Sequence, residues 1–351
     1  MNKSIKYLIP AVMALTLVAC GGSSSKSGAS YSGKSDPANF SSADTATKTQ
    51  IGNDSATVIS EAIDISDSDG FLGDFPVAAT TQDGSKLQSK AQKYINISLA
   101  QASQAKAQDS TLSSLPVGAS ESVTIPCSSG EMVLTINGND NSENMKMQMT
   151  YKNCRQDDSD GDYDLTNGTV IYSVSYSEKS NDSSIKIEFK NLKEEFVWNN
   201  GPKETFLING YYKVTGLNIS QDDDVDFSEA VYTAEWDLTG TENGKSIASK
   251  GSMKCTVNGC TVGTTVKTAD GKTYKVEDFE VVTNSQGDPS SAKGTIYHPD
   301  HGYYTFTANI TDAWCDEDDP SPFAGTATFT DNAGNKIEYS SQACGNEPTI
   351  N

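Results

Sequence analysis

The hydrophobic positions of this chain change their spacing once, near residue 120. Before that point two segments repeat apolar residues at helical spacing. The first covers about 54–64, where Val58, Ile59, Ala62 and Ile63 follow Asn53-Asp54, and the second runs from about 84 to 107. We expect two short helices, each packing one apolar face on a larger domain.

From Glu121 onward apolar and polar residues alternate, as expected for antiparallel strands that bury one face. The alternating runs include 145–151, 170–176, 185–189, 206–214, 232–238, 304–310 and 337–339. In the segment from Tyr274 to Val281 the alternation slips by one residue, which predicts a β-bulge. The pattern predicts a mainly β fold: a large antiparallel meander forming a curved sheet, an open barrel or a sandwich, preceded by two short helices.

Six cysteines lie within or beside this β region: Cys127, Cys154, Cys255, Cys260, Cys315 and Cys344. An even number in an exported chain indicates disulfides. Spacing favours neighbours in order, so that each bridge braces one hairpin, although other pairings remain open. A zinc site is disfavoured because paired Cys-x-x-Cys spacing and nearby histidines are missing.

The amino terminus has the layout of a secretory signal. Lys3 and Lys6 precede an apolar run that is too short to span a bilayer, and the run ends in Leu17-Val18-Ala19-Cys20. This ending resembles the lipobox of bacterial lipoproteins. The resemblance implies cleavage before Cys20, attachment of diacylglycerol to its thiol and usually acylation of the new amino group. Several acyl chains anchor a protein stably where one does not.

These patterns divide the chain into four parts. Residues 1–19 form the signal peptide, 20–42 the lipidated cysteine and a flexible tether rich in Ser and Gly, 43–115 a helical segment and 116–351 the β domain. The whole arrangement, with motifs such as Tyr151-Lys152-Asn153-Cys154 closing a hairpin, resembles uncharacterised proteobacterial β-rich envelope lipoproteins. That resemblance is to an architecture and implies no activity.

Charge and targeting narrow the location and the partners. The chain has 26 basic and 47 acidic residues, a formal net charge of −21, so nucleic acid and anionic lipid surfaces should repel it. The lipid on Cys20 is therefore the expected membrane contact. Gly21 lies where an aspartate would indicate inner-membrane retention, so the resemblance implies the outer membrane of a Gram-negative bacterium, facing periplasm or cell surface.

One acidic segment offers candidate metal ligands. Asp158, Asp160, Asp162 and Asp164 alternate around Gly161, as oxygen ligands do in calcium loops. The EF-hand pattern fails at both ends, since Gln156 and Asn167 occupy the first and twelfth positions. A solvated acidic loop is the favoured interpretation, and calcium is the alternative.

The only histidines, His298 and His301, flank Pro299-Asp300. Proline and glycine around them favour a plain turn over a metal site with Asp300. No serine-hydrolase elbow, phosphate loop or zinc-peptidase motif is present.

We therefore expect no catalytic residues and no cofactor other than possible calcium, and a non-enzymatic binding or scaffolding role toward a protein, glycan or lipid. An extracellular polysaccharide hydrolase and a calcium-stabilised surface adhesin are the alternatives.

Overall fold

The computed structural model describes residues 29–64, 120–137, 144–157, 161–175, 183–199, 201, 203–217, 231–256, 259–284, 288–313, 315 and 319–351. Within these residues one short 3₁₀ helix, one α-helix and fifteen strands are present. The predicted helix at 84–107 lies outside the described residues. No helix among the described residues is long and apolar enough to cross a membrane.

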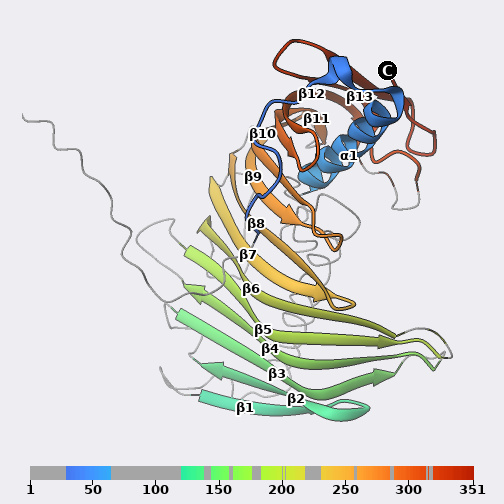
Figure 1. The fold of residues 1–351 in the computed structure, drawn as a ribbon. Helices are drawn as coiled ribbons and strands as arrows, with labels where there is room; N and C mark the ends of the chain where they lie inside the picture. Colours follow the sequence, from blue (N-terminus) through green and yellow to red (C-terminus); the bar gives the residue numbers. More distant parts are fainter. Residues whose placement is uncertain are drawn as a thin grey trace, which may run out of the picture.

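All fifteen described strands belong to one antiparallel sheet in which each strand pairs with its neighbours in the sequence. They are β1 (Ser120–Pro126), β2 (Ser129–Asn137), β3 (Asn144–Asp157), β4 (Tyr163–Ser175), β5 (Ser183–Val197), β6 (Lys203–Leu217), β7 (Tyr232–Glu242), β8 (Lys245–Thr256), β9 (Gly259–Lys267), β10 (Thr273–Thr283), β11 (Pro289–His298), β12 (Gly302–Asp312), β13 (Ala324–Thr330), β14 (Lys336–Ser341) and β15 (Thr349–Ile350). The sheet is open and strongly curved (Figure 1). The predicted β-meander is confirmed, and the two-sheet sandwich is wrong.

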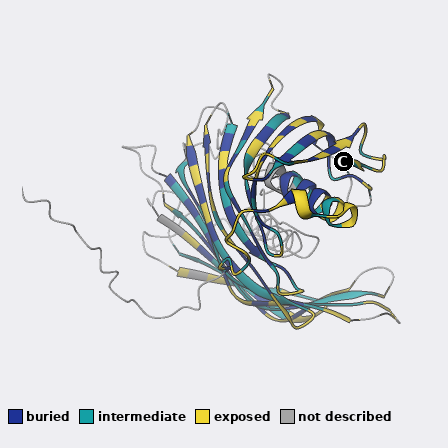
Figure 2. Ribbon diagram, turned by 45° about the horizontal axis from the view of Figure 1, so that its top comes forward, coloured by how far each residue is buried: buried dark blue, intermediate teal, exposed yellow. Residues whose placement is uncertain are grey.

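The alternation in the sequence becomes alternation between the two faces of the sheet. Buried and exposed residues follow one another along the strands (Figure 2). In β5, for example, Ile185, Ile187 and Phe189 are buried while the residues between them are not. The apolar residues of successive strands thus form one continuous core on the inner face.

Bulges keep this pattern in phase over the long strands. In β10 the pairing with β9 shifts between Val276 and Phe279, and the pairing with β11 shifts between Glu277 and Glu280. Asp278, which lies within both intervals, has a positive φ of 51°. The bulge returns Phe279 to the inner face, where it is fully buried. This confirms the bulge predicted from the slipped alternation between Tyr274 and Val281.

The α-helix α1 (Thr45–Asp64) packs at the carboxyl-terminal end of the sheet, where it contacts β11, β14 and β15 (Figure 1). It begins nine residues earlier than the predicted start at about 54, so that boundary is wrong. The Asp44 carboxylate accepts a hydrogen bond of 2.8 Å from the Thr47 amide and caps the helix. Asn53-Asp54, which resemble a helix start, lie inside α1 instead.

The prediction of a flexible tether over residues 20–42 extends too far along the chain. From Ala29 the chain lies on the sheet, and we call residues 29–43 the strap. Pro37 bridges to Tyr303, and the Ala38 amide donates to the Tyr303 carbonyl at 2.9 Å. Phe40, in the 3₁₀ helix η1 (Phe40–Ser42), is 1% exposed within the core. The long-range partners of these residues, not their own composition, order the strap.

Candidate functional site

The six cysteines of the β domain form three disulfides. Cys127 pairs with Cys154, Cys255 with Cys260 and Cys315 with Cys344. Cys255 and Cys260 face each other directly across β8 and β9, while the other two bridges close longer loops. The predicted framework and the pairing of neighbours in order are both confirmed. Of the seven cysteines in the sequence, only Cys20 has no place in this framework.

The acidic segment proposed for calcium lies partly outside the described residues, since Asp158 and Asp160 are not among them. Asp162 uses its Oδ1 atom to accept a hydrogen bond of 2.7 Å from the Asn199 amide, and Asp164 lies in β4. Among the described residues one group brings potential ligand atoms together, namely Cys315, Asp319 and Cys344. Its two cysteines are bonded to each other, so their thiolates are not available as ligands. Calcium binding at Asp158 to Asp164 remains a prediction.

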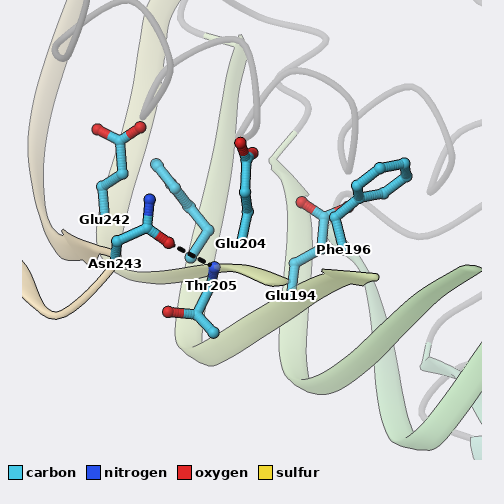
Figure 3. Close-up of a pocket in the computed structure, with 7 residues that line it drawn as sticks. Glu194, Phe196, Glu204, Thr205, Glu242 and Asn243 are labelled. Atoms are coloured by element: carbon cyan, nitrogen blue, oxygen red, sulfur yellow. Dashed lines mark hydrogen bonds between the residues drawn. The ribbon is translucent and has the colours of Figure 1, made fainter. Parts of the chain in front are cut away.

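A pocket opens at the edge of the sheet formed by strand ends, beside the β5–β6 and β7–β8 hairpin turns (Figure 3). The space in and in front of it, including open solvent, is about 340 Å³. It is lined by Glu194, Phe196, Glu204, Thr205, Phe206, Glu242 and Asn243. Glu194, Phe206 and Glu242 are register partners across β5, β6 and β7. The pocket is therefore acidic because three neighbouring strands each place a glutamate at one end of the inner face.

The floor of this pocket is fixed by the β7–β8 turn. Asn243, with a positive φ of 48°, accepts a hydrogen bond from the Thr205 amide on its Oδ1 atom at 2.9 Å. The Asn243 amide donates in return to the Thr205 carbonyl at 2.8 Å. The seven lining residues include no histidine, cysteine or serine, and the pocket offers the carboxylates of three glutamates together with the Thr205 hydroxyl and the rings of Phe196 and Phe206.

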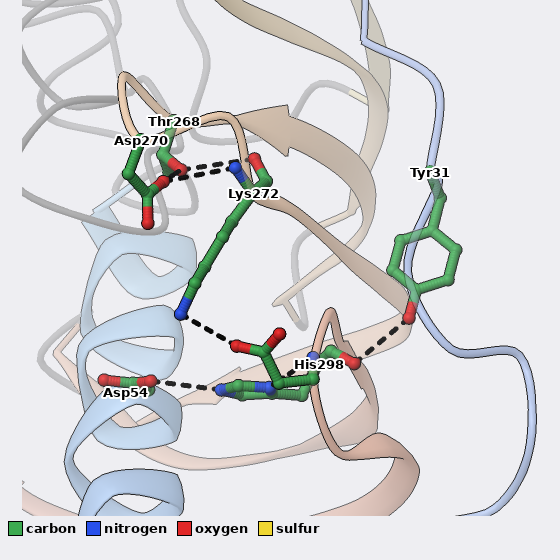
Figure 4. A network of polar contacts seen from close by, with 7 residues as sticks. Tyr31, Asp54, Thr268, Asp270, Lys272 and His298 are labelled. Atoms are coloured by element: carbon green, nitrogen blue, oxygen red, sulfur yellow. Dashed lines mark hydrogen bonds and ion pairs between the residues drawn. The ribbon is translucent and has the colours of Figure 1, made fainter.

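A polar cluster lies between α1 and the β11–β12 turn, where His298 faces Asp54 (Figure 4). The other histidine of the chain, His301, lies beside His298. His298 is fully buried at the end of β11, with Nε2 3.0 Å from Oδ2 of Asp54 on α1. The Asp300 amide donates to its Nδ1 atom at 3.2 Å. Because Nδ1 accepts, the ring proton must lie on Nε2, so a neutral His298 donates to Asp54.

Charged neighbours surround this contact. Lys272, in the β9–β10 turn, lies 2.8 Å from the Asp300 carboxylate. The side-chain hydrogen bond from Lys272 lowers the pKa of Asp300, and the same bond raises the pKa of Lys272. The His301 ring lies 4.5 Å from that of His298, centre to centre. Burial, followed by the charge of His298, lowers the pKa of His301.

The strap closes the other side of the cluster. The Tyr31 hydroxyl lies 2.7 Å from the Lys34 carbonyl and 3.1 Å from the His298 carbonyl, and the Lys34 amide donates to the Pro299 carbonyl at 3.1 Å. The predicted turn at residues 298–302 is confirmed. The alternative metal site with Asp300 is not supported, since the two histidines and Asp300 do not bring ligand atoms together among the described residues.

Sequence reasoning missed the role of this turn in holding α1. The partner that sequence reasoning did not identify is Asp54. It lies 244 positions from His298, and its sequence context is typical of a helix start. The sequence offered one signal for this contact: a turn that contains histidines and a proline, together with an amphipathic helix elsewhere in the chain. No known protein family matches this chain, and no curated protein or solved structure matches it either.

Proposed function

We propose that this chain is a lipid-anchored protein of the bacterial envelope whose β sheet has a non-enzymatic binding or scaffolding role. The observation that carries the proposal is the distribution of the cysteines. All six that follow Cys20 are paired in disulfides, which persist in oxidising compartments. The one remaining thiol is at the lipobox, where lipid attachment would consume it.

The location follows from the same features. A Gram-negative periplasm is kept oxidising by dedicated enzymes, which fits three disulfides in one chain. With Gly21 after the cysteine, the lipobox favours the outer membrane, with the domain facing either periplasm or cell surface. The acidic net charge of −21 gives the protein little attraction for anionic lipid, so the acyl chains on Cys20 would be its membrane contact.

The form of the sheet supports binding over catalysis. Fifteen hydrogen-bonded strands braced by three disulfides provide a long surface that is fixed in shape. The outer positions of the strands are polar and carry cross-strand ion pairs, such as Lys293 with Glu280 at 2.7 Å and Lys213 with Glu235 at 3.8 Å. A protein, glycan or lipid partner is proposed, because extended surfaces of this kind bind by shape and polar complementarity.

Fractionation of cells that express the full chain tests the anchor. We expect the wild-type protein in the outer-membrane fraction and the Cys20→Ser variant in the inner membrane as an unprocessed precursor, or in the periplasm. A wild-type protein recovered entirely in the soluble periplasm would overturn the anchor.

Affinity capture tests the binding role. The membrane-extracted wild-type protein, used as bait on envelope extract, should retain a discrete protein, glycan or lipid. A matched bait with reversed charges on the outer face, Lys213→Glu with Lys293→Glu, should retain less of it. Retention of nothing above an unrelated lipoprotein, or release of reducing sugar from cell-wall polysaccharide, would contradict the binding proposal.

A further inference from the structure

The two histidines of the chain lie together at a place where α1, the strap and the sheet meet. Imidazole is the side chain that normally changes its charge between pH 5 and 8. The structure assigns to this pair a regulatory role: we propose that His298 and His301 form an acid-sensitive latch that holds α1 and the strap on the sheet at neutral pH and releases them on acidification.

The latch depends on the neutral form of His298. In that form Nε2–H donates to Asp54 on α1, while Nδ1 accepts the Asp300 amide of the turn. Protonation places a hydrogen on Nδ1 as well, so two N–H groups would then face each other at 3.2 Å. His298 is fully buried, so water cannot replace the lost acceptor unless the turn opens.

His301 adds a second positive charge at the same place. Its ring lies 4.5 Å from that of His298, so two imidazolium ions would repel each other across a partly buried contact. Burial, followed by the positive charge that His298 carries once protonated, lowers the pKa of His301 from its usual value. A histidine with a lowered folded-state pKa takes up protons more readily in the open state, so acidification below about pH 6.5 favours opening.

The other ionisable groups around the pair determine how strong this effect is. They are Asp54 from α1, Asp270 and Lys272 from the β9–β10 turn, Tyr274 from β10, Asp300 from the β11–β12 turn, Tyr304 from β12, and Tyr31 and Lys34 from the strap. Asp300 is already paired with Lys272, so its carboxylate is largely compensated before any histidine is charged. Asp54 is then the principal anion facing His298, and the charges of Asp300 and Asp54 oppose, without outweighing, the effects that lower the pKa of His301.

If the β11–β12 turn opened, both the strap and α1 would lose contacts with it. The His298 carbonyl lies 3.1 Å from the Tyr31 hydroxyl, and the Pro299 carbonyl accepts from the Lys34 amide, so the strap is bonded to this turn. Asp54 links the same turn to α1. The rest of the sheet contains no histidine, so its strands should not respond to this titration.

Hydrogen exchange measured by mass spectrometry at pH 7.5 and pH 5.0, corrected for intrinsic exchange rates, tests the latch. We expect protection in residues 45–64 of the full chain to fall about tenfold or more at pH 5.0, while β5 and β6 keep theirs. His298→Gln retains one donor and one acceptor but does not titrate, so its α1 should lose most of the response. His301→Gln, which removes only the second cation, should show an intermediate response. Equal protection of wild-type α1 at the two pH values, or an unchanged response in His298→Gln, would overturn the proposal.

Nitrogen-15 NMR of the histidine rings in the wild-type protein gives a test that needs no variant. His298 should carry its proton on Nε2 at pH 7.5 and become doubly protonated over the pH range in which α1 loses protection. A His298 that is doubly protonated at pH 7.5, or that stays neutral while α1 opens, would also overturn it.

Discussion

The hydroxyl of Ser55 on α1 lies 2.7 Å from the hydroxyl of Tyr304 on β12, and both side chains are buried. Ser55 Oγ also lies 2.5 Å from the Ile51 carbonyl, which can only accept. The single hydroxyl proton of Ser55 is therefore directed to Ile51, and Tyr304 must be the donor to Ser55. This bond and the Asp54–His298 contact are two polar links that join α1 to the sheet.

Tyr304→Phe should remove this bond without leaving an unpaired donor on Ser55. We expect a loss of about 1 kcal/mol in the free energy of unfolding, measured by urea denaturation at pH 7. Tyr303→Phe is the matched control, because its hydroxyl accepts an exposed bond of 3.3 Å from the Asn332 side chain and lies outside the buried contact with α1. Equal stability of the two variants would show that the buried hydroxyl contributes nothing.

Asp331 joins the strap to the β13–β14 turn. Its Oδ2 accepts from the Phe40 amide at 2.9 Å and from the Asn335 side chain at 2.9 Å. Its Oδ1 accepts from the Ala333 and Asn335 amides at 2.9 and 2.8 Å. Asp331→Asn would turn an NH₂ group toward two of these donors, so we expect a loss of about 1.5–3 kcal/mol in unfolding free energy at pH 7. Asp36→Asn, an exposed strap residue, should change it by less than about 0.5 kcal/mol.

The effect of Asp331 should depend on pH in one direction. Burial alone would raise the pKa of Asp331, but the hydrogen bonds from Asn335, Phe40 and Ala333 together hold it below its usual value. A carboxyl with a lowered folded-state pKa stabilises the fold above its unfolded value of about 3.9, and that contribution is lost as the pH falls through the folded-state pKa. The difference between wild type and Asp331→Asn should therefore shrink below pH 4. A difference that grows on acidification would contradict this.

Gly251 leaves room for an aromatic ring. It is the register partner of Trp236, and a Cβ atom placed on it would overlap the indole ring and approach the Gly263 carbonyl. Trp236 is buried and donates from Nε1 to the Ser249 hydroxyl at 3.0 Å. Gly251→Ala should therefore cost about 1–3 kcal/mol of stability and shift the tryptophan emission spectrum. Gly345→Ala, with open space around it, should do neither.

The three disulfides should contribute different amounts to the free energy of unfolding. Cys127–Cys154 and Cys315–Cys344 span 27 and 29 positions, whereas Cys255–Cys260 spans 5. In the loop-entropy description, removal of either long-range bridge costs about 3.5 kcal/mol and removal of the short one about 2 kcal/mol. Paired cysteine-to-alanine variants, unfolded in urea, measure this order. A larger loss for the short bridge would show that loop entropy does not decide the ranking.

The strands were predictable because a strand that buries one face has apolar residues at every second position. Ile185, Ile187 and Phe189 show this alternation within a few residues of sequence. The bulge at Asp278 was predictable for the same reason, since a slipped alternation must be absorbed within the strand. The cysteine pairing followed from the order of hairpins in a meander, where neighbours in sequence are also neighbours in space.

The start of α1 and the strap were predicted incorrectly for a different reason. Asn53-Asp54 has the composition of a helix start, but Asp54 is used for a contact with a turn 244 residues away. The strap has few apolar residues, and it is ordered by partners such as Tyr303 and Asp331 that lie far along the chain. The sequence around the strap and around Asp54 does not indicate these distant partners. The acidic pocket was missed because its glutamates come from three strands and acquire a common location only through the register.

The central claim, that the thiol of Cys20 carries a lipid, is tested most directly by mass spectrometry of the amino-terminal peptide of the protein purified from membranes. The account predicts that the mature chain begins at Cys20 and that this residue carries the mass of a diacylglyceryl group, normally with a further acyl chain on the amino group. A mature chain that begins at another residue, or a Cys20 without lipid, would contradict it.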